Sequence, residues 1–107
     1  MDKIPEIEYY NGRAVCALRG DLNLYQVGPL KRLLMTELER TRDRLESLEF
    51  LMEEVNTIDS SMLALIYQMQ KIFKARGKIF LLRRPSRNVL AVLNITALDQ
   101  HIQIELD

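Results

Sequence analysis

Three adjacent polar residues, Asp59-Ser60-Ser61, form the pattern with the clearest chemical potential in this chain. They stand between the segment 55–58 and a long apolar stretch that begins at Met62. Aspartate and serine are favoured N-cap residues, so the simplest interpretation is the start of a helix. A serine at a helix N-terminus is also exposed, and the unpaired backbone N–H groups there can accommodate a phosphate. The pattern therefore predicts a helix cap, a modifiable serine, or both.

The other reactive residue types lack partners. His101 is the only histidine and has no second histidine or cysteine near it in the sequence, so we expect no metal site. Cys16 is the single cysteine and lies in the apolar run 14–18, where a buried, inert thiol is expected. The sequence contains no P-loop, no glycine-rich dinucleotide turn and no HExxH. We therefore expect no catalytic residues, no cofactor and no enzymatic activity.

Length and charge limit the classes of function. With 107 residues, of which 48% are hydrophobic and 28% charged, we expect one globular domain spanning residues 1–107. Fifteen basic residues balance fifteen acidic ones, which argues against direct DNA binding driven by net charge. Residues 1–6 lack the apolar stretch of a signal peptide, and no apolar run is long enough to cross a bilayer. The expected location is the cytoplasm.

The elements that must position the Asp-Ser-Ser segment can be traced along the chain. Asn11-Gly12 predicts a tight hairpin between strands at residues 4–10 and 13–19, because both residues tolerate positive φ. The segment 20–23 then ends the strand and offers Asp21 or Asn23 as a helix cap. Apolar residues at helical spacing predict a helix over 27–44, and a short apolar run predicts a central strand at 48–52.

The second half of the chain continues the alternation. The helix after Asp59-Ser60-Ser61 is expected to run to about residue 76 and to end at Gly77. A fully apolar strand follows at 79–82, Ser86 caps a third helix, and residues 102–106 alternate as a last strand. The predicted order is β-β-α-β-α-β-α-β. This is an α/β fold with a mixed β-sheet and helices packed on it.

This order, read together with the segment 55–63, resembles the STAS domain family, which includes bacterial anti-anti-sigma factors and domains of sulfate transporters. Val55-Asn56-Thr57-Ile58-Asp59-Ser60-Ser61-Met62-Leu63 is similar to the family's apolar strand, Ile-Asp-Ser-Ser and Gly-Leu. Gly20-Asp21-Leu22-Asn23 is similar to its Gly-Glu/Asp-Leu-Asp, and Ser86-Arg87-Asn88-Val89 follows its third helix. The resemblance covers nearly the whole chain. Two departures are Met62, where the family has glycine, and Asn23, where aspartate is frequent.

The resemblance implies a function of the anti-sigma factor antagonist type. In that branch of the family, an anti-sigma factor that is also a serine kinase phosphorylates the second serine of the motif, which implies Ser61, with Ser60 as the alternative. A serine phosphatase would restore the free form, so that partner switching regulates transcription in bacteria. The implied partner-binding residues are Asp21, Asn23, Asp59, Ser60, Ser61 and Met62.

Two alternatives stay open. The loss of the family glycine at Met62 favours a STAS subunit that works only by binding, for example in an ABC-type lipid transport system with an ATPase subunit as partner, or another signalling scaffold. An oligomer is also possible. Separately, basic residues accumulate between positions 71 and 87, which indicates either a docking face for an acidic partner or anionic lipid, or ordinary solvated helix ends and turns.

Overall fold

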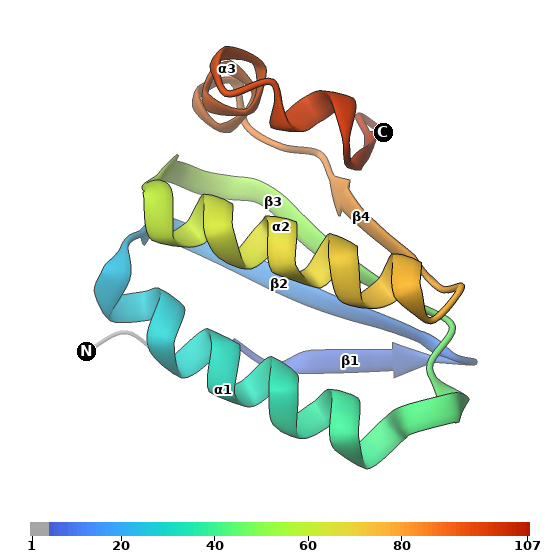
Figure 1. Cartoon of the computed structure of the whole chain (residues 1–107). Helices are drawn as coiled ribbons and strands as arrows, with labels where there is room; N and C mark the ends of the chain where they lie inside the picture. The colour runs from blue at the N-terminus through green and yellow to red at the C-terminus, as the bar shows by residue number, and fades with distance from the viewer. Residues whose placement is uncertain (1–4) are drawn as a thin grey trace.

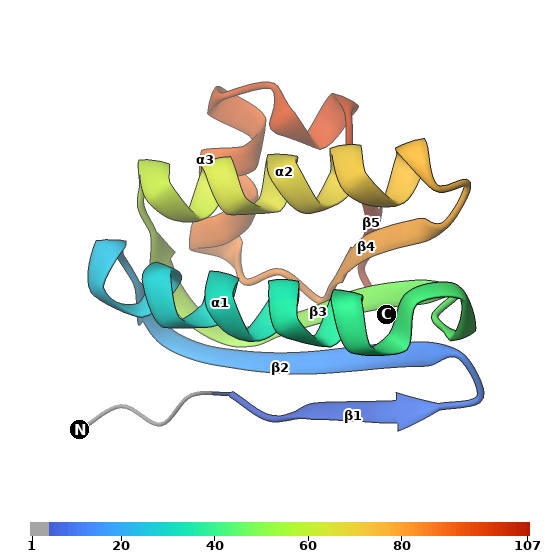
Figure 2. The ribbon, with the colours of Figure 1, turned by 60° about the horizontal axis from the view of Figure 1, so that its bottom comes forward.

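A computed structural model describes residues 5–107, and in it the predicted order of elements is confirmed. The regular elements are β1 (Ile7–Tyr10), β2 (Arg13–Leu22), α1 (Leu24–Thr41), β3 (Ser47–Ile58), α2 (Ser60–Ala75), β4 (Ile79–Arg83), α3 (Arg87–Ile95) and β5 (Gln103–Glu105). Figure 1 labels all of them except β5, which is labelled in Figure 2. Short 3₁₀ turns at Arg42–Arg44 and Leu98–Gln100 follow α1 and α3.

The five strands form one mixed sheet in the order β1-β2-β3-β4-β5. β1 is antiparallel to β2, whereas β2 to β5 are parallel to one another. Each parallel connection passes through a helix, and successive crossovers in the same direction place their helices on the same face of a sheet. Figure 2 shows α1 and α2 above one face. The carboxyl ends of β2, β3 and β4 therefore meet at one edge of the sheet, and every helix begins at that edge. We call it the carboxyl edge.

Strand periodicity explains where the core lies. Alternate residues of β2, β3 and β4, such as Cys16, Phe50 and Leu82, are fully buried beneath the helices. Phe50 and Phe80 pack edge to face with ring centroids 5.0 Å apart, an arrangement worth about 0.5–1.5 kcal/mol beyond burial. All three helices contribute to this one cluster of buried side chains, including Met69 of α2. The prediction that Cys16 is buried is confirmed.

The opposite face of the sheet carries an ion-pair chain rather than a second apolar layer. Glu49 of β3 is only 5% exposed, although it points away from the helices. Its carboxylate lies 3.3 Å from Nη2 of Arg13 and 2.8 Å from Nε of Arg83. Arg83 also pairs with Glu105 of β5 at 2.8 Å. The guanidinium groups on both sides therefore compensate the one acidic residue buried in the central strand.

Several predicted boundaries in the first half of the chain were wrong. The first strand begins at Ile7, and position 4 of the prediction lies outside the described residues. The predicted hairpin is confirmed, with φ of +47° at Asn11 and +84° at Gly12. β2 does not end at residue 19, because Gly20 adopts a φ of +78° within an irregularity of the β2–β3 pairing and the strand continues to Leu22.

The later elements are of the predicted type, but their lengths differ from the prediction. α1 begins three residues before the predicted start, and its α-helical part ends at Thr41. β3 reaches from Ser47 to Ile58 instead of covering 48–52 alone, because it pairs with the extended β2. The last strand is limited to Gln103–Glu105. Ile102 is buried just before it, whereas Leu106, predicted on the same face, is 66% exposed.

Candidate functional site

The carboxyl edge of the sheet brings together the starts of α1, α2 and α3. Each start is capped by a polar side chain that follows a parallel strand: Asn23 directly after β2, Asp59 directly after β3, and Ser86 three residues after β4. In open α/β sheets, ligands bind outside the carboxyl ends of the strands. The predicted Asp-Ser-Ser segment lies here, so the topology places it where partners have access to the loops.

Asp59 is the centre of the hydrogen bonds at this edge. One carboxylate oxygen, Oδ1, accepts from the N–H groups of Ser61 at 2.9 Å and Met62 at 3.1 Å, and from the Ser61 hydroxyl at 2.5 Å. The other oxygen, Oδ2, accepts from the backbone N–H of Leu24 at 3.0 Å. The N–H of Asp59 in turn donates to the carbonyl of Leu22 at 3.2 Å. Asp59 therefore caps α2 and also ties it to the start of α1.

These donors explain the electrostatic state of the carboxylate. The hydrogen bond from the Ser61 hydroxyl, followed by those from the Met62, Leu24 and Ser61 N–H groups, holds the pKa of Asp59 below its usual value, against an opposing effect of burial. The group is therefore ionised at neutral pH. A permanent negative charge next to the Ser61 hydroxyl follows from this geometry.

Asp21 and Asn23, the two residues of the predicted site at the junction of β2 and α1, have roles different from that of Asp59. Asp21 is exposed, pairs with Thr57 across β2 and β3, and accepts a hydrogen bond from the Thr57 hydroxyl at 2.9 Å. Asn23 is the cap of α1, and its side chain accepts from the Tyr25 N–H at 2.9 Å. Gln26 completes a capping box by accepting from the Asn23 N–H at 3.2 Å.

The three residues that follow Asp59 differ sharply in accessibility. Ser60 is exposed, Ser61 is half-buried, and Met62 is fully buried in the core. The structure thus brings five of the six predicted partner-binding residues to the surface of the carboxyl edge, but not the side chain of Met62. Its thioether fills space beneath α2 where the family motif has no side chain.

Sequence reasoning missed the residues that begin α1. Leu24 and Tyr25 are the first two residues of this helix, and they are 67% and 83% exposed. The prediction started the helix at residue 27 and therefore left both in a loop. The capping box of Asn23 and Gln26, which is visible in the sequence, is the signal that indicates the earlier start.

The basic residues between positions 71 and 87 do not form one face. Arg83 and Arg84 pair with Glu49 and Glu53, and the ammonium of Lys71 lies over the ring of Tyr67. Their dispersal favours the interpretation of solvated helix ends and turns.

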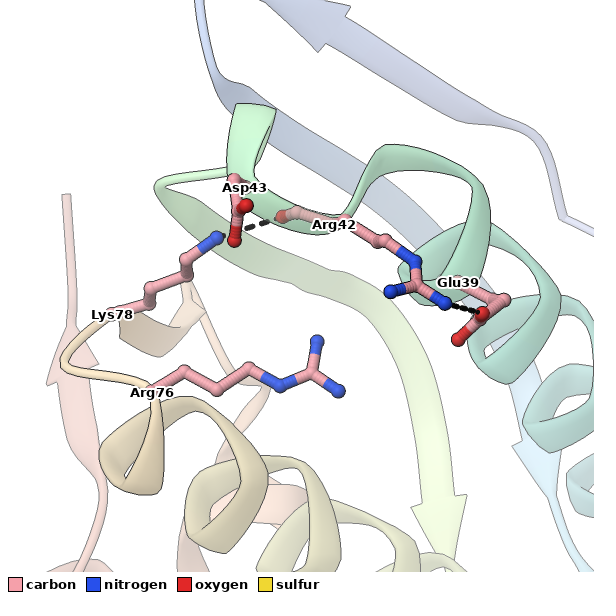
Figure 3. A pocket seen from close by; sticks show the side chains of 5 residues that line it. All are labelled: Glu39, Arg42, Asp43, Arg76 and Lys78. Atoms are coloured by element: carbon pink, nitrogen blue, oxygen red, sulfur yellow. Dashed lines mark hydrogen bonds and ion pairs between the residues drawn. The ribbon is translucent and has the colours of Figure 1, made fainter.

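An open cavity of about 410 Å³ lies at the other end of α1 and α2 (Figure 3), far from the predicted site. It is lined by Glu39, Arg42, Asp43, Arg76 and Lys78. Arg42 pairs with Glu39, and Lys78 donates to the Arg42 carbonyl at 2.8 Å. Two helices end here, where the dipole favours cations. The basic residues are therefore explained by the helix ends they border.

Within residues 5–107 there is no group of three histidine, cysteine or acidic side chains able to hold a metal ion. In the same residues, no helix is both long and apolar enough to span a membrane.

Comparison with known proteins identifies a family. The model of the STAS domain family matches residues 5–107. Comparison with curated proteins finds none with significant sequence similarity.

Solved structures share the fold at low sequence identity. A candidate anti-sigma factor antagonist from Thermotoga maritima superimposes with a TM-score of 0.85 at 22% identity, covering 94% of this chain and 85% of that one. The anti-sigma factor antagonist SpoIIAA in its unphosphorylated form gives 0.75 at 17% identity, with 96% and 87% covered. The phosphorylated form of SpoIIAA, described as a Bacillus cell fate determinant, gives 0.73 at 18%, with 94% and 89% covered. At these identities the likeness concerns the fold.

Proposed function

Because the chain belongs to the STAS domain family, we propose that it is a regulator of the anti-sigma factor antagonist type. It binds an anti-sigma factor that is also a serine kinase, and phosphorylation of Ser61 ends the binding. A serine phosphatase restores the free form. The observation that carries the proposal is the hydroxyl of Ser61 on the accessible carboxyl edge, held by an ionised Asp59 at 2.5 Å.

Electrostatics supports a switch at this position. A phosphate on Ser61 adds a charge of about −1.5 to −2 next to the Asp59 carboxylate. Asp21 also lies exposed on this edge. The modified edge therefore repels an acidic partner surface and has a larger desolvation penalty on docking. The unmodified edge lacks the charge of the phosphate, so both the repulsion and the desolvation penalty are smaller.

The exposed ridge of α2 extends the surface available to a partner. Ser60, Ala64, Tyr67 and Lys71 are all exposed and follow one another at spacings of three or four residues, so they lie along one side of the helix. Tyr67 is 46% exposed, and tyrosine is enriched in protein interfaces. A kinase that reaches Ser61 can contact this ridge at the same time.

A second function is favoured by one observation. Met62 occupies the core where the family has glycine, and Ser61 already serves the Asp59 cap. Both residues then have structural roles in a STAS subunit that only binds, with the ATPase subunit of an ABC-type lipid transport system as its partner. In either case we propose that the chain acts as a single-domain binding protein in the cytoplasm, not as an enzyme.

A pull-down from the native host separates the two functions. Wild-type protein, Ser61→Ala, Ser61→Asp and the control Gln100→Glu serve as baits; Gln100 is exposed in the turn after α3, away from the carboxyl edge. We expect wild type and Ser61→Ala to retain a protein kinase, Ser61→Asp to lose it, and Gln100→Glu to keep it. In addition, the kinase should transfer phosphate from ATP to wild type and not to Ser61→Ala. An ATPase subunit retained by all four baits would establish the second function instead.

A further inference from the structure

Two large apolar side chains stand in solvent next to the Asp59–Ser61 turn. Leu24 and Tyr25 are exposed to 67% and 83%, and they occupy the first two positions of α1. Acidic residues are favoured in the first turn of a helix because they face its positive end, and α1 has none there. Helix-start chemistry therefore does not account for leucine and tyrosine at these positions. Tyrosine, by contrast, is among the residues that contribute most to protein interfaces.

The backbone of this exposed pair is fastened to the proposed switch. The N–H of Leu24 donates to Oδ2 of Asp59 at 3.0 Å, while Oδ1 of the same carboxylate accepts from the hydroxyl of Ser61. One oxygen of the carboxylate thus accepts a hydrogen bond from α1, and the other accepts from α2. Any change at Ser61 that moves or repels Asp59 also acts on the hydrogen bond that holds the first turn of α1.

We propose that Leu24 and Tyr25 form the apolar anchor of the partner-binding surface, and that Asp59 couples this anchor to the state of Ser61. The inference rests on the proposed function and adds the contact residues and the means by which phosphorylation reaches them. The partner is the protein kinase of the proposed function, with an apolar pocket that receives Leu24 and Tyr25. Its surface next to Ser61 is acidic, so that a phosphate on Ser61 repels it.

The chemistry of the modification explains the coupling. The Ser61 oxygen attacks the γ-phosphorus of ATP, an Oγ–P bond forms, the bond to the ADP oxygen breaks, and the hydroxyl proton passes to the catalytic base of the kinase. Ser61 then has no proton to donate to Oδ1 of Asp59 and instead carries a phosphate of like charge. The phosphate also competes for the N–H groups at the start of α2, which are anion-binding groups. Asp59 is displaced, and the Leu24 N–H loses its acceptor.

The anchor is tested by the affinity for the partner retained in the pull-down. Tyr25→Ala and Leu24→Ala are compared with Ile95→Ala, a matched control that is also 83% exposed but lies at the far end of α3. We expect Tyr25→Ala to weaken binding by about tenfold or more, as at an interface hot spot, and Ile95→Ala to change it less than about twofold. Unchanged affinity in both α1 variants overturns the anchor while leaving the proposed function intact.

The coupling is tested without any partner. Amide hydrogen exchange of Leu24, measured by NMR, is compared among wild type, the Ser61-phosphorylated protein, Ser61→Ala and Asp59→Asn, with core amides of α2 as the reference for global stability. We expect phosphorylation and Asp59→Asn to accelerate Leu24 exchange by about tenfold relative to the core, and Ser61→Ala to do so by much less. A Leu24 rate unaffected by phosphorylation contradicts the coupling.

Light scattering tests whether a second copy of this chain, instead of a different protein, covers the anchor. If wild type forms a dimer that Tyr25→Ala abolishes, a second copy of the chain covers the anchor and the proposal of a protein partner is overturned. A wild-type monomer that loses kinase binding on Tyr25→Ala supports it. If Ser61→Asp binds the kinase as well as wild type does, while phosphorylation still accelerates Leu24 exchange, the proposed function is overturned and the coupling stands.

Discussion

Removing the Asp59 carboxylate tests the structural argument in its simplest form. Asp59→Ala deletes the acceptor of the Ser61 and Met62 N–H groups and, at the same time, the acceptor of the Leu24 N–H at 3.0 Å. One substitution therefore uncaps α2 and unties α1 from it. Asp21→Ala is the matched control, because Asp21 is exposed and accepts a single side-chain hydrogen bond, from Thr57.

The magnitude follows from the two losses. Replacing an N-cap aspartate by alanine costs about 0.5–2 kcal/mol. A hydrogen bond to a charged group is worth about 1.5–3 kcal/mol, but water can reach the exposed start of α1, so we take about 1 kcal/mol for the Leu24 bond. Together these give a loss of about 2 kcal/mol, or about 8–16 °C in Tm for a domain of roughly this size.

Urea unfolding followed by circular dichroism measures the free energy of unfolding of wild type and both variants. Asp59→Ala should lower the midpoint without changing the slope, which reports a loss of stability in an otherwise similar native state. Asp21→Ala should stay within about 0.5 kcal/mol of wild type. If the two variants were equally stable, the role of Asp59 as the link between α1 and α2 would be refuted.

The remaining predictions concern pH, packing and the thiol. The pKa of Asp59 is lowered in the folded state, so its stabilising effect is present above the unfolded-state value of about 3.9 and is lost as pH falls through the folded-state value. The difference in unfolding free energy between wild type and Asp59→Asn should therefore shrink below about pH 4, and a constant difference down to pH 2 would contradict this. Met62→Ala should cost about 2–4 kcal/mol because the side chain is fully buried, whereas Met35→Ala, 40% exposed on α1, should cost less than about 1 kcal/mol in the same assay. Burial raises the pKa of the Cys16 thiol to about 12, so a thiol reagent should label it only at the rate at which the protein opens, and labelling as fast as in urea-unfolded protein would count against its burial.

The elements with local signals were predictable from the sequence. Asn11-Gly12 specifies its turn through residues that tolerate positive φ, and the caps at Asp59 and Ser86 lie directly before their helices. The start of α1 was misplaced even though its capping box is local. The predicted start at residue 27 follows the first apolar residue at helical spacing, although the sequence also offers Asn23 as a cap, and Asn23 is the N-cap of α1.

The remaining features depend on contacts between distant residues. β2 continues past Gly20 because β3 is there to pair with it, a fact that no local pattern contains. The bond between Leu24 and Asp59 joins residues 35 positions apart, and the pairing of Glu49 with Arg13 and Arg83 joins three strands. Sequence reasoning therefore found the Asp-Ser-Ser turn, but neither its link to α1 nor the exposed pair that the link holds.

The most direct test of the central proposal is phosphopeptide mapping of the protein isolated from its own host, with fragmentation that distinguishes Ser60 from Ser61. The account predicts phosphate on Ser61, at a level that changes between growth and stress, and no phosphate on Ser60. Protein that carries no phosphate on Ser61 under any of these conditions would contradict the proposed switch, and a constitutive binding subunit would then be the better explanation of the same fold.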